Sequence, residues 1–283
     1  MVYLSYFQGQ LVVIPLVINH FSSETLNQVF KREEIDIRKE LFSKLFILKE
    51  KGFVLSVSPD ISNPKDVGET FERELGIDPN SRIMADYKGK IELKAKREST
   101  GTKDTLFSMV PNWSKSFIKS SNEMILSFGY EANKLKYNGY LDLFITVNNR
   151  PNNQGLYLET DEDNNYLHQM HSSFNDFSIS TCVWDLPEIN SRLMSKHSET
   201  IWVVAKEKRL DGRIYFAFDS VEHTQRPIFS SFLLQISKGI VTYDWRGRVK
   251  VDGSKYKDKG HCFRINPKYR NTIFGETNII NLN

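Results

Sequence analysis

The segment of residues 85–94 has the clearest potential for chemistry, because it contains two carboxylates and a lysine. It ends in Glu92-Leu93-Lys94, and Asp86 precedes the glutamate by one short turn. Side chains two apart on a strand leave from the same face, so a strand here places Glu92 and Lys94 together and turns Leu93 into a core. Carboxylates are ligands that Mg²⁺ prefers. The pattern indicates either a metal site for phosphodiester hydrolysis or a plain ion pair on a solvated strand.

The residues before this segment predict a short amphipathic helix over 68–76. Phe71 and Leu75 lie one turn apart on its apolar side, and Gly76 provides a C-terminal cap. Glu72 borders the apolar side, either as a surface residue or as a third carboxylate above the metal site. Residues 105–109 predict the next strand of the same sheet.

Three motifs occur in an order that resembles a known family. They are the helix at 68–76, residues 86–94 followed by 105–107, and the pair of segments 244–246 and 260–266. Together they resemble the MvaI/BcnI type of restriction endonucleases, which are PD-(D/E)XK nucleases related in architecture to the mismatch-repair nickase MutH. Ala85 departs from the proline of that motif. The gap between the acidic residues is one longer than in some relatives, so a turn at Gly89 must absorb it.

The resemblance implies an α/β (α+β) fold: a PD-(D/E)XK restriction-endonuclease-like mixed sheet flanked by helices, with a DNA-recognition lobe. Residues 1–283 then form a single nuclease domain of two lobes. The catalytic core is centred on 40–125 and supported by 184–240. DNA-recognition elements lie mainly within 241–270, and residues 1–40 are an N-terminal extension.

The resemblance also assigns roles in the candidate active site. Asp86, Glu92 and the backbone carbonyl of Leu93 bind Mg²⁺, for which Mn²⁺ can substitute. Lys94 positions the nucleophilic water, and Glu72 assists as a further catalytic carboxylate. The expected products carry 5′-phosphates.

The segment 246–270 is rich in lysine, arginine and aromatic residues, which is typical of a surface that follows phosphates. Arginine reads guanine and aspartate accepts from cytosine, so Asp244 and Arg246 on one strand face can read a G·C pair, and Arg264 a second guanine. The alternative is that Asp244 and Arg246 only pair with each other. Further predicted DNA contacts are Arg248, Lys250, His261, Lys65 and Arg97.

Composition is that of an ordinary globular protein of 283 residues, with 40% hydrophobic and 26% charged residues and a net charge of +3. Two cysteines, Cys182 and Cys262, are too few for a disulfide framework or a zinc cluster and indicate reduced thiols. The apolar run 11–18 is short, is interrupted by Pro15 and lacks a basic leader, so it predicts a buried strand. We expect a cytoplasmic bacterial or archaeal protein.

Other patterns supply the remaining elements. Residues 22–51 predict one or two helices, and further helices are expected at 185–196, with Asp185 as N-cap, and at 227–238. The apolar run 201–205 predicts a central strand that pairs with 213–218. The acidic residues 161–163 lack the glycine and distal glutamate of an EF-hand loop, so no calcium site is expected.

The sequence therefore predicts a Mg²⁺-dependent type II restriction endonuclease that cuts double-stranded DNA at a short G·C-rich site. We expect a monomer without a membrane partner, and a companion methyltransferase in the host that forms no stable complex with it. Alternatives are a MutH-like nickase or phage-defence nuclease with the same active site, and a catalytically inactive DNA-binding module.

Overall fold

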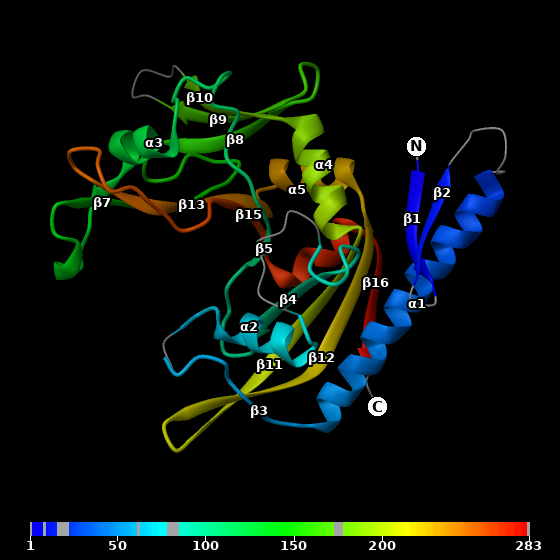
Figure 1. The fold of residues 1–283 in the computed structure, drawn as a ribbon. Helices are drawn as coiled ribbons and strands as arrows, with labels where there is room; N and C mark the ends of the chain where they lie inside the picture. The colour runs from blue at the N-terminus through cyan, green and yellow to red at the C-terminus, as the bar shows by residue number, and fades with distance from the viewer. Residues whose placement is uncertain are drawn as a thin grey trace. The chain divides into compact units, whose positions relative to one another are not determined.

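The structure is a computed structural model that describes residues 2–7, 10–15, 23–60, 63–77, 85–172 and 178–281. These residues form two compact units, 1–52 and 53–283. Figure 1 shows the elements of each unit along the chain. Every residue predicted to take part in catalysis or DNA binding belongs to the second unit.

The first unit consists of a hairpin and a long helix. Strands β1 (Val2–Phe7) and β2 (Gln10–Pro15) pair antiparallel, and α1 spans Ser23–Glu50 as one helix. Leu41, Leu45 and Leu48 are buried at helical spacing. The sequence predicted a buried strand over residues 11–18. Residues 16–18, and the exposure of the side chains of β2, lie outside the described part of the structure. No helix among the described residues is long and apolar enough to cross a membrane.

A mixed sheet in the second unit carries the predicted metal site, as expected. Its strands follow the order β16, β12, β11, β4, with β3 beside β12. Only the β4–β11 pair is parallel among the described pairs of this sheet. The strands are β3 (Val54–Leu55), β4 (Glu92–Arg97), β11 (Glu199–Leu210), β12 (Arg213–Pro227) and β16 (Phe274–Asn281). The buried apolar start of β11 confirms its predicted central position.

Helices flank this sheet. Helix α2 (Asp66–Glu74) contacts β4, and Phe71 packs on Phe218 with ring centroids 5.1 Å apart. Gly76 ends α2 as predicted, with φ of +74° and a 2.9 Å hydrogen bond from its N–H to the Arg73 carbonyl. Helix α4 (Leu186–His197) begins at the predicted N-cap Asp185, although that side chain makes no capping bond.

Two further antiparallel sheets complete the unit. The second sheet has the order β5, β15, β13, β7, β6, with β14 beside β13, and the third has the order β10, β9, β8. The strands are β5 (Asp104–Ser108), β6 (Tyr130–Glu131), β7 (Tyr140–Val147), β8 (Leu156–Asp161), β9 (Tyr166–Ser172), β10 (Ser178–Asp185), β13 (Val241–Lys250), β14 (Lys257–Asp258) and β15 (Cys262–Ile265). The remaining elements are α3 (Ser121–Phe128), α5 (Phe229–Ser237) and the 3-10 turns η1 (Leu135–Tyr137) and η2 (Pro267–Thr272). Buried aromatic residues, including Trp184, Trp245 and Phe263, form their common core.

Strand β5 corrects one expectation. Residues 105–109 were expected to extend the sheet of β4, but β5 pairs with β15 in the second sheet. Packing of Phe107 on Phe263, with ring centroids 5.2 Å apart, favours this pairing because both rings enter the aromatic core. The chain therefore passes directly from the sheet of Lys94 to the sheet of Asp244 and Arg264.

Candidate active site and nucleic-acid interface

A tight turn positions Asp86 beside the first residues of β4. Lys88 and Gly89 have positive φ angles of 52° and 70°, and two isolated β-bridges close the turn. Gly89 adopts this conformation without a side-chain penalty. The turn spans the residues between Asp86 and Glu92. It brings the Asp86 Oδ2 atom within 3.1 Å of the Leu93 backbone N–H, which donates a hydrogen bond to it.

Glu92 lies at the centre of the site and has a lysine at each carboxylate oxygen. The Lys94 ammonium donates to Oε1, and the Lys196 Nζ atom lies 3.3 Å from Oε2. Glu92 is only 1% exposed, and Leu93 is buried on the opposite side of the strand. The predicted orientation of Glu92, Lys94 and Leu93 is therefore confirmed.

Lys196 was not predicted from the sequence. It lies in the last turn of α4, 104 residues from Glu92. A lysine in the last turn of a helix is common because it complements the helix dipole. No local sequence signal distinguishes Lys196 from such residues.

Glu72 and Asp86 share an acidic environment. Burial raises the pKa of Glu72, and the charge of Asp86 raises it further. Burial likewise raises the pKa of Asp86, followed by the charge of Glu92, while Lys94 opposes both increases. Carboxylates crowded in this way are stabilised in their charged form by a cation.

The donor set fits a hard divalent cation. Asp86 and Glu92 supply carboxylate oxygens, and the Leu93 carbonyl belongs to the residue between Glu92 and Lys94. Within the described ranges, no group of three or more His, Cys, Asp or Glu side chains is arranged to hold a metal ion. Mg²⁺ usually binds one or two carboxylates and retains several waters, so two carboxylates suffice.

His197 fixes the end of α4 behind this site. Its Nε2 atom donates to the Leu106 carbonyl at 2.7 Å, so its Nδ1 atom accepts from the Thr200 hydroxyl at 2.9 Å. The ring stacks on Trp202 with centroids 5.6 Å apart. Complete burial lowers the pKa of His197 to about 3, and the charge of Lys94 contributes. The imidazole is therefore a neutral structural link between α4, β5 and β11.

We expect His197 to make stability depend on pH. The unfolded chain binds a proton below its ordinary histidine pKa of about 6.5, whereas the folded protein does not until about pH 3. Stability is thus complete above about pH 6.5 and falls by about 1.4 kcal/mol per pH unit below it. Chemical denaturation from pH 7 to pH 5 should show a smaller loss in His197→Gln than in the unmodified protein. His168→Gln, at a half-buried histidine, is the control and should retain the full slope.

The second predicted cluster forms around Asp244. Asp244 pairs with Arg264, not with Arg246: the Arg264 NH1 to Asp244 Oδ2 distance is 2.8 Å. Thr146 donates to the other oxygen at 2.9 Å, and the second terminal nitrogen of Arg264 donates to the Lys103 carbonyl. These bonds use two of the five N–H donors of the guanidinium. Arg264 lies on the strand next to Asp244, as predicted.

Arg246 and His261 meet on adjoining segments. Arg246 is half-buried, its side chain bonds the Cys262 thiol, and no acid forms an ion pair with it among the described residues. The Arg246 backbone N–H donates to His261 Nδ1 at 3.0 Å. His261 is 2% exposed, and its Nε2 atom lies 2.9 Å from the Tyr256 hydroxyl. Burial lowers the pKa of His261, so the ring is neutral and supports the backbone of Arg246.

Arg248 is held inside the second sheet, whereas Lys250 is half-exposed. The guanidinium of Arg248 pairs with Asp142, with Nε 3.1 Å from Oδ1 and NH2 3.3 Å from Oδ2, and it lies 3.5 Å from the centre of the Tyr137 ring. Of the two predicted contacts, Lys250 is the more accessible.

Arg97 and Lys65 also differ in accessibility, because Arg97 is held by acidic residues and Lys65 is exposed. Arg97 NH2 lies 2.8 Å from each oxygen of buried Asp66, and its NH1 lies 2.9 Å from Glu207. Arg97 thereby ties β4 to the first turn of α2. Lys65 precedes α2 and is exposed.

A basic cavity of about 260 Å³ is lined by Lys94 of the candidate active site and by Lys103, whose carbonyl accepts from Arg264. Lys94 and Lys96 line it from β4, Lys103 lines it from the loop between β4 and β5, and Arg270 lines it from η2. The acidic residue Asp104 in the lining pairs with Lys96 at 3.0 Å and with Arg270 at 2.7 Å. The cavity therefore presents positive charge beside Lys94, which suits a phosphate backbone.

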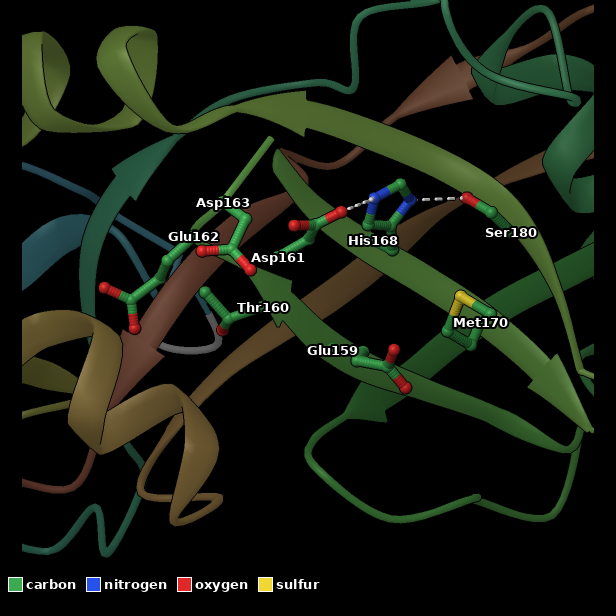
Figure 2. A pocket seen from close by; sticks show the side chains of 8 residues that line it. All are labelled: Glu159, Thr160, Asp161, Glu162, Asp163, His168, Met170 and Ser180. Carbon is green, nitrogen blue, oxygen red and sulfur yellow. Dashed lines mark hydrogen bonds and ion pairs between the residues drawn. The ribbon is translucent and has the colours of Figure 1, made fainter. Parts of the chain in front are cut away.

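A separate cavity of about 460 Å³ contains the acidic residues 161–163 (Figure 2). Figure 2 shows His168 between Asp161 and Ser180, with ring nitrogens 3.9 Å and 2.8 Å from their oxygens. Asp161 also accepts from the backbone and side chain of Asn164, which lowers its pKa. These bonds close the turn between β8 and β9.

The chain is similar to a known protein family and to solved structures of one restriction endonuclease. The family model described as "MvaI/BcnI restriction endonuclease family" matches residues 42–274. A structure of restriction endonuclease MvaI with its cognate DNA substrate is similar with a TM-score of 0.72 and 19% identity, over 84% of this chain and 96% of that chain. MvaI in the absence of DNA is similar with a TM-score of 0.50 and 19% identity, over 86% and 96% of the two chains. No curated protein sequence matches the chain.

Proposed function

The chain belongs to the MvaI/BcnI restriction endonuclease family, and on this premise we propose that it is a Mg²⁺-dependent type II enzyme that cuts double-stranded DNA at a short G·C-rich site. Restriction endonucleases are site-specific deoxyribonucleases that generally use a divalent metal ion. The contacts of Glu92 carry the proposal: its carboxylate lies between Lys94 and Lys196, next to an Asp86 fixed by the Leu93 amide.

In this proposal Asp86, Glu92 and the Leu93 carbonyl would hold the metal ion, and a bound ion would supply polarisation of the scissile phosphate and a lower pKa of the attacking water. Lys94 positions that water and offsets the charge that develops on phosphorus. Lys196 fixes the plane of the Glu92 carboxylate. The water oxygen bonds to phosphorus while the bond to the 3′ oxygen breaks. The attacking water loses a proton to Glu72 or to solvent, and the leaving 3′ oxygen takes one from solvent, so the products are a 3′-hydroxyl and a 5′-phosphate.

We propose a supporting role for Glu72 and not a direct metal contact. It belongs to α2, whereas both metal-binding carboxylates belong to the turn and β4. Burial and the charge of Asp86 raise its pKa, so it is a stronger proton acceptor than an exposed glutamate.

Base recognition is assigned to Asp244, Arg246 and Arg264. The Asp244 carboxylate fixes the Arg264 fork, which then reads guanine, and Arg246 reads a neighbouring base from the same strand as Asp244. Lys250 and Lys65 are accessible for phosphate contacts. We assign Arg97, Arg248 and His261 to positioning, because each is engaged by neighbouring protein groups.

We further propose that the enzyme acts as a monomer in the cytoplasm of a bacterium or archaeon. A separate methyltransferase would protect host DNA without forming a stable complex with it. Mn²⁺ should replace Mg²⁺, because it accepts the same oxygen ligands.

Incubation of unmethylated phage DNA with the purified protein and Mg²⁺ tests this function. We expect discrete fragments that disappear when EDTA is added, and sequencing of their ends gives the recognition site and the end chemistry. A smear or single-strand nicks would replace the proposal by the phage-defence or nickase alternative. Tight binding without cleavage would favour an inactive DNA-binding module.

A further inference from the structure

Two hairpin ends adjoin at one edge of the second sheet. They are the loop 132–139 between β6 and β7 and the segment 251–256 between β13 and β14, here called the paired tips. The Val251 N–H donates to the Gly139 carbonyl at 3.1 Å and joins them. Helix α5 precedes the start of β13, so the paired tips lie at the opposite end of that strand.

The loop 132–139 is held in a defined shape. The Tyr137 N–H donates to the Lys134 carbonyl at 2.7 Å within η1. The Tyr137 ring lies 3.5 Å from the guanidinium of Arg248, which is itself fixed by Asp142. Arg248, which the sequence predicted to contact DNA, thus stabilises the loop 132–139 through its contact with Tyr137. A loop held in this way loses little entropy when it binds a partner.

The loop presents an apolar side chain between two cations. Leu135 is 97% exposed, and Lys134 and Lys136 beside it are exposed. Val251 in the neighbouring tip is 62% exposed. Apolar side chains flanked by lysines are typical of protein segments that enter a DNA groove while cations contact the phosphates on either side.

The excess of positive charge in and around the paired tips favours an anionic partner. Residues 131–139 and 250–259 contain six lysines and three acidic residues. Of these acids, Asp252 and Asp258 accept from the backbone N–H groups of Ser254 and Gly260 at 2.8 Å and 2.7 Å. Within the described ranges, none of the six lysines forms an ion pair with an acid. The lysines are Lys134, Lys136, Lys250, Lys255, Lys257 and Lys259.

The paired tips extend the strand that carries the proposed reading residues. In the register of β13 and β7, Arg246 lies opposite Phe144, and Lys250 lies opposite Tyr140. At about 3.3 Å per residue, the tips begin about 16 Å beyond Arg246, five residues along the chain. This distance corresponds to about five base pairs of duplex at 3.4 Å each. The tips can therefore contact DNA outside a short recognition site.

We propose that the paired tips bind the duplex that flanks the recognition site, with Lys134 and Lys136 on backbone phosphates and Leu135 against the groove between them. This inference rests on the proposed function, because it requires DNA in the candidate site. The contact adds affinity and orients the duplex, without reading sequence.

Binding to duplexes that carry the mapped cleavage site tests the inference. One duplex has flanks of about three base pairs and the other of about twelve, since only the second reaches beyond the tips. We expect the unmodified protein, in EDTA, to bind the longer duplex about tenfold more tightly. Lys134→Ala/Lys136→Ala should lose this preference, and its salt slope on the longer duplex should fall by about two because each phosphate contact contributes about 0.9.

Leu135→Ala should reduce the preference for the longer duplex without changing the salt slope, because it removes no charge. Lys208→Ala/Lys238→Ala removes the same charge at two exposed lysines elsewhere, and Leu210→Ala truncates a leucine that is 48% exposed at another hairpin. Both control variants should keep the preference. All variants should bind the short duplex like the unmodified protein.

The inference would be overturned if the tip variants preferred the longer duplex as strongly as the unmodified protein does. It would also be overturned if the unmodified protein bound both duplexes equally well. A change of molecular mass in light scattering of Leu135→Ala would also overturn it, because the tips would then serve a protein contact. Failure of the unmodified protein to cut the longer duplex with Mg²⁺ would instead overturn the proposed function.

Discussion

Replacement of Lys94 by alanine is expected to abolish DNA cleavage while DNA binding is retained. Lys94 donates to Glu92 and lines the basic cavity, so it lies where water and phosphate would meet. Loss of such a group lowers the chemical rate by about 10²- to 10⁴-fold. Single-turnover cleavage with Mg²⁺ measures this rate directly, and a mobility shift in EDTA measures binding.

Lys90→Ala is the matched control for this prediction, because Lys90 is an exposed lysine in the turn that carries Asp86. It should cut at the normal rate. Thermal denaturation of both variants separates lost chemistry from lost folding. Normal cleavage by a folded Lys94→Ala protein would contradict the assignment of the whole active site, since Glu92 and Asp86 are chosen from the same motif.

Replacement of Arg264 is expected to remove sequence specificity more than cleavage itself. A bidentate contact to guanine contributes about 1–3 kcal/mol of discrimination, so the preference for the cognate site over a site with one changed G·C pair should fall by roughly 5- to 150-fold. Cleavage rates on the two duplexes give this ratio. Weak binding to unrelated DNA should persist, because phosphate contacts supply it.

Two variants separate base reading from support of the fold. Arg264→Ala leaves the largely buried Asp244 without its cation and should also lower stability. Arg264→Lys keeps the charge but loses the planar fork, so it should lose discrimination with a smaller loss of stability. Arg213→Ala, at an exposed arginine, should change neither. An Arg264→Lys protein with full discrimination would exclude Arg264 as a reading residue.

Direct bonds beside the basic cavity link the residues proposed for base recognition to those proposed for catalysis. Arg264 donates to the carbonyl of Lys103, and the next residue, Asp104, pairs with Lys96 on the strand of Lys94. A displacement of Arg264 towards a base would therefore be transmitted through a short series of direct bonds. The residues proposed for specificity and for catalysis are therefore joined through the loop between β4 and β5.

Short-range sequence rules are sufficient to predict the local elements of the candidate active site. The helix around Phe71 and its end at Gly76 follow from apolar spacing and from the positive φ that glycine allows. The turn at Gly89 and the common side of Glu92 and Lys94 follow from the same short-range rules. The family resemblance and the mixed sheet flanked by helices were also accessible, because ordered motifs carry them.

Which distant residues meet depends on how the whole chain packs. Lys196 joins Glu92 because α4 ends above β4, and β5 joins β15 because Phe107 enters the aromatic core. Arg264 pairs with Asp244 because neighbouring strands in register bring a cation to a carboxylate that is only 7% exposed. Burial and pairing across long stretches of chain depend on the complete packing, and periodicity within a segment carries no information about its partner.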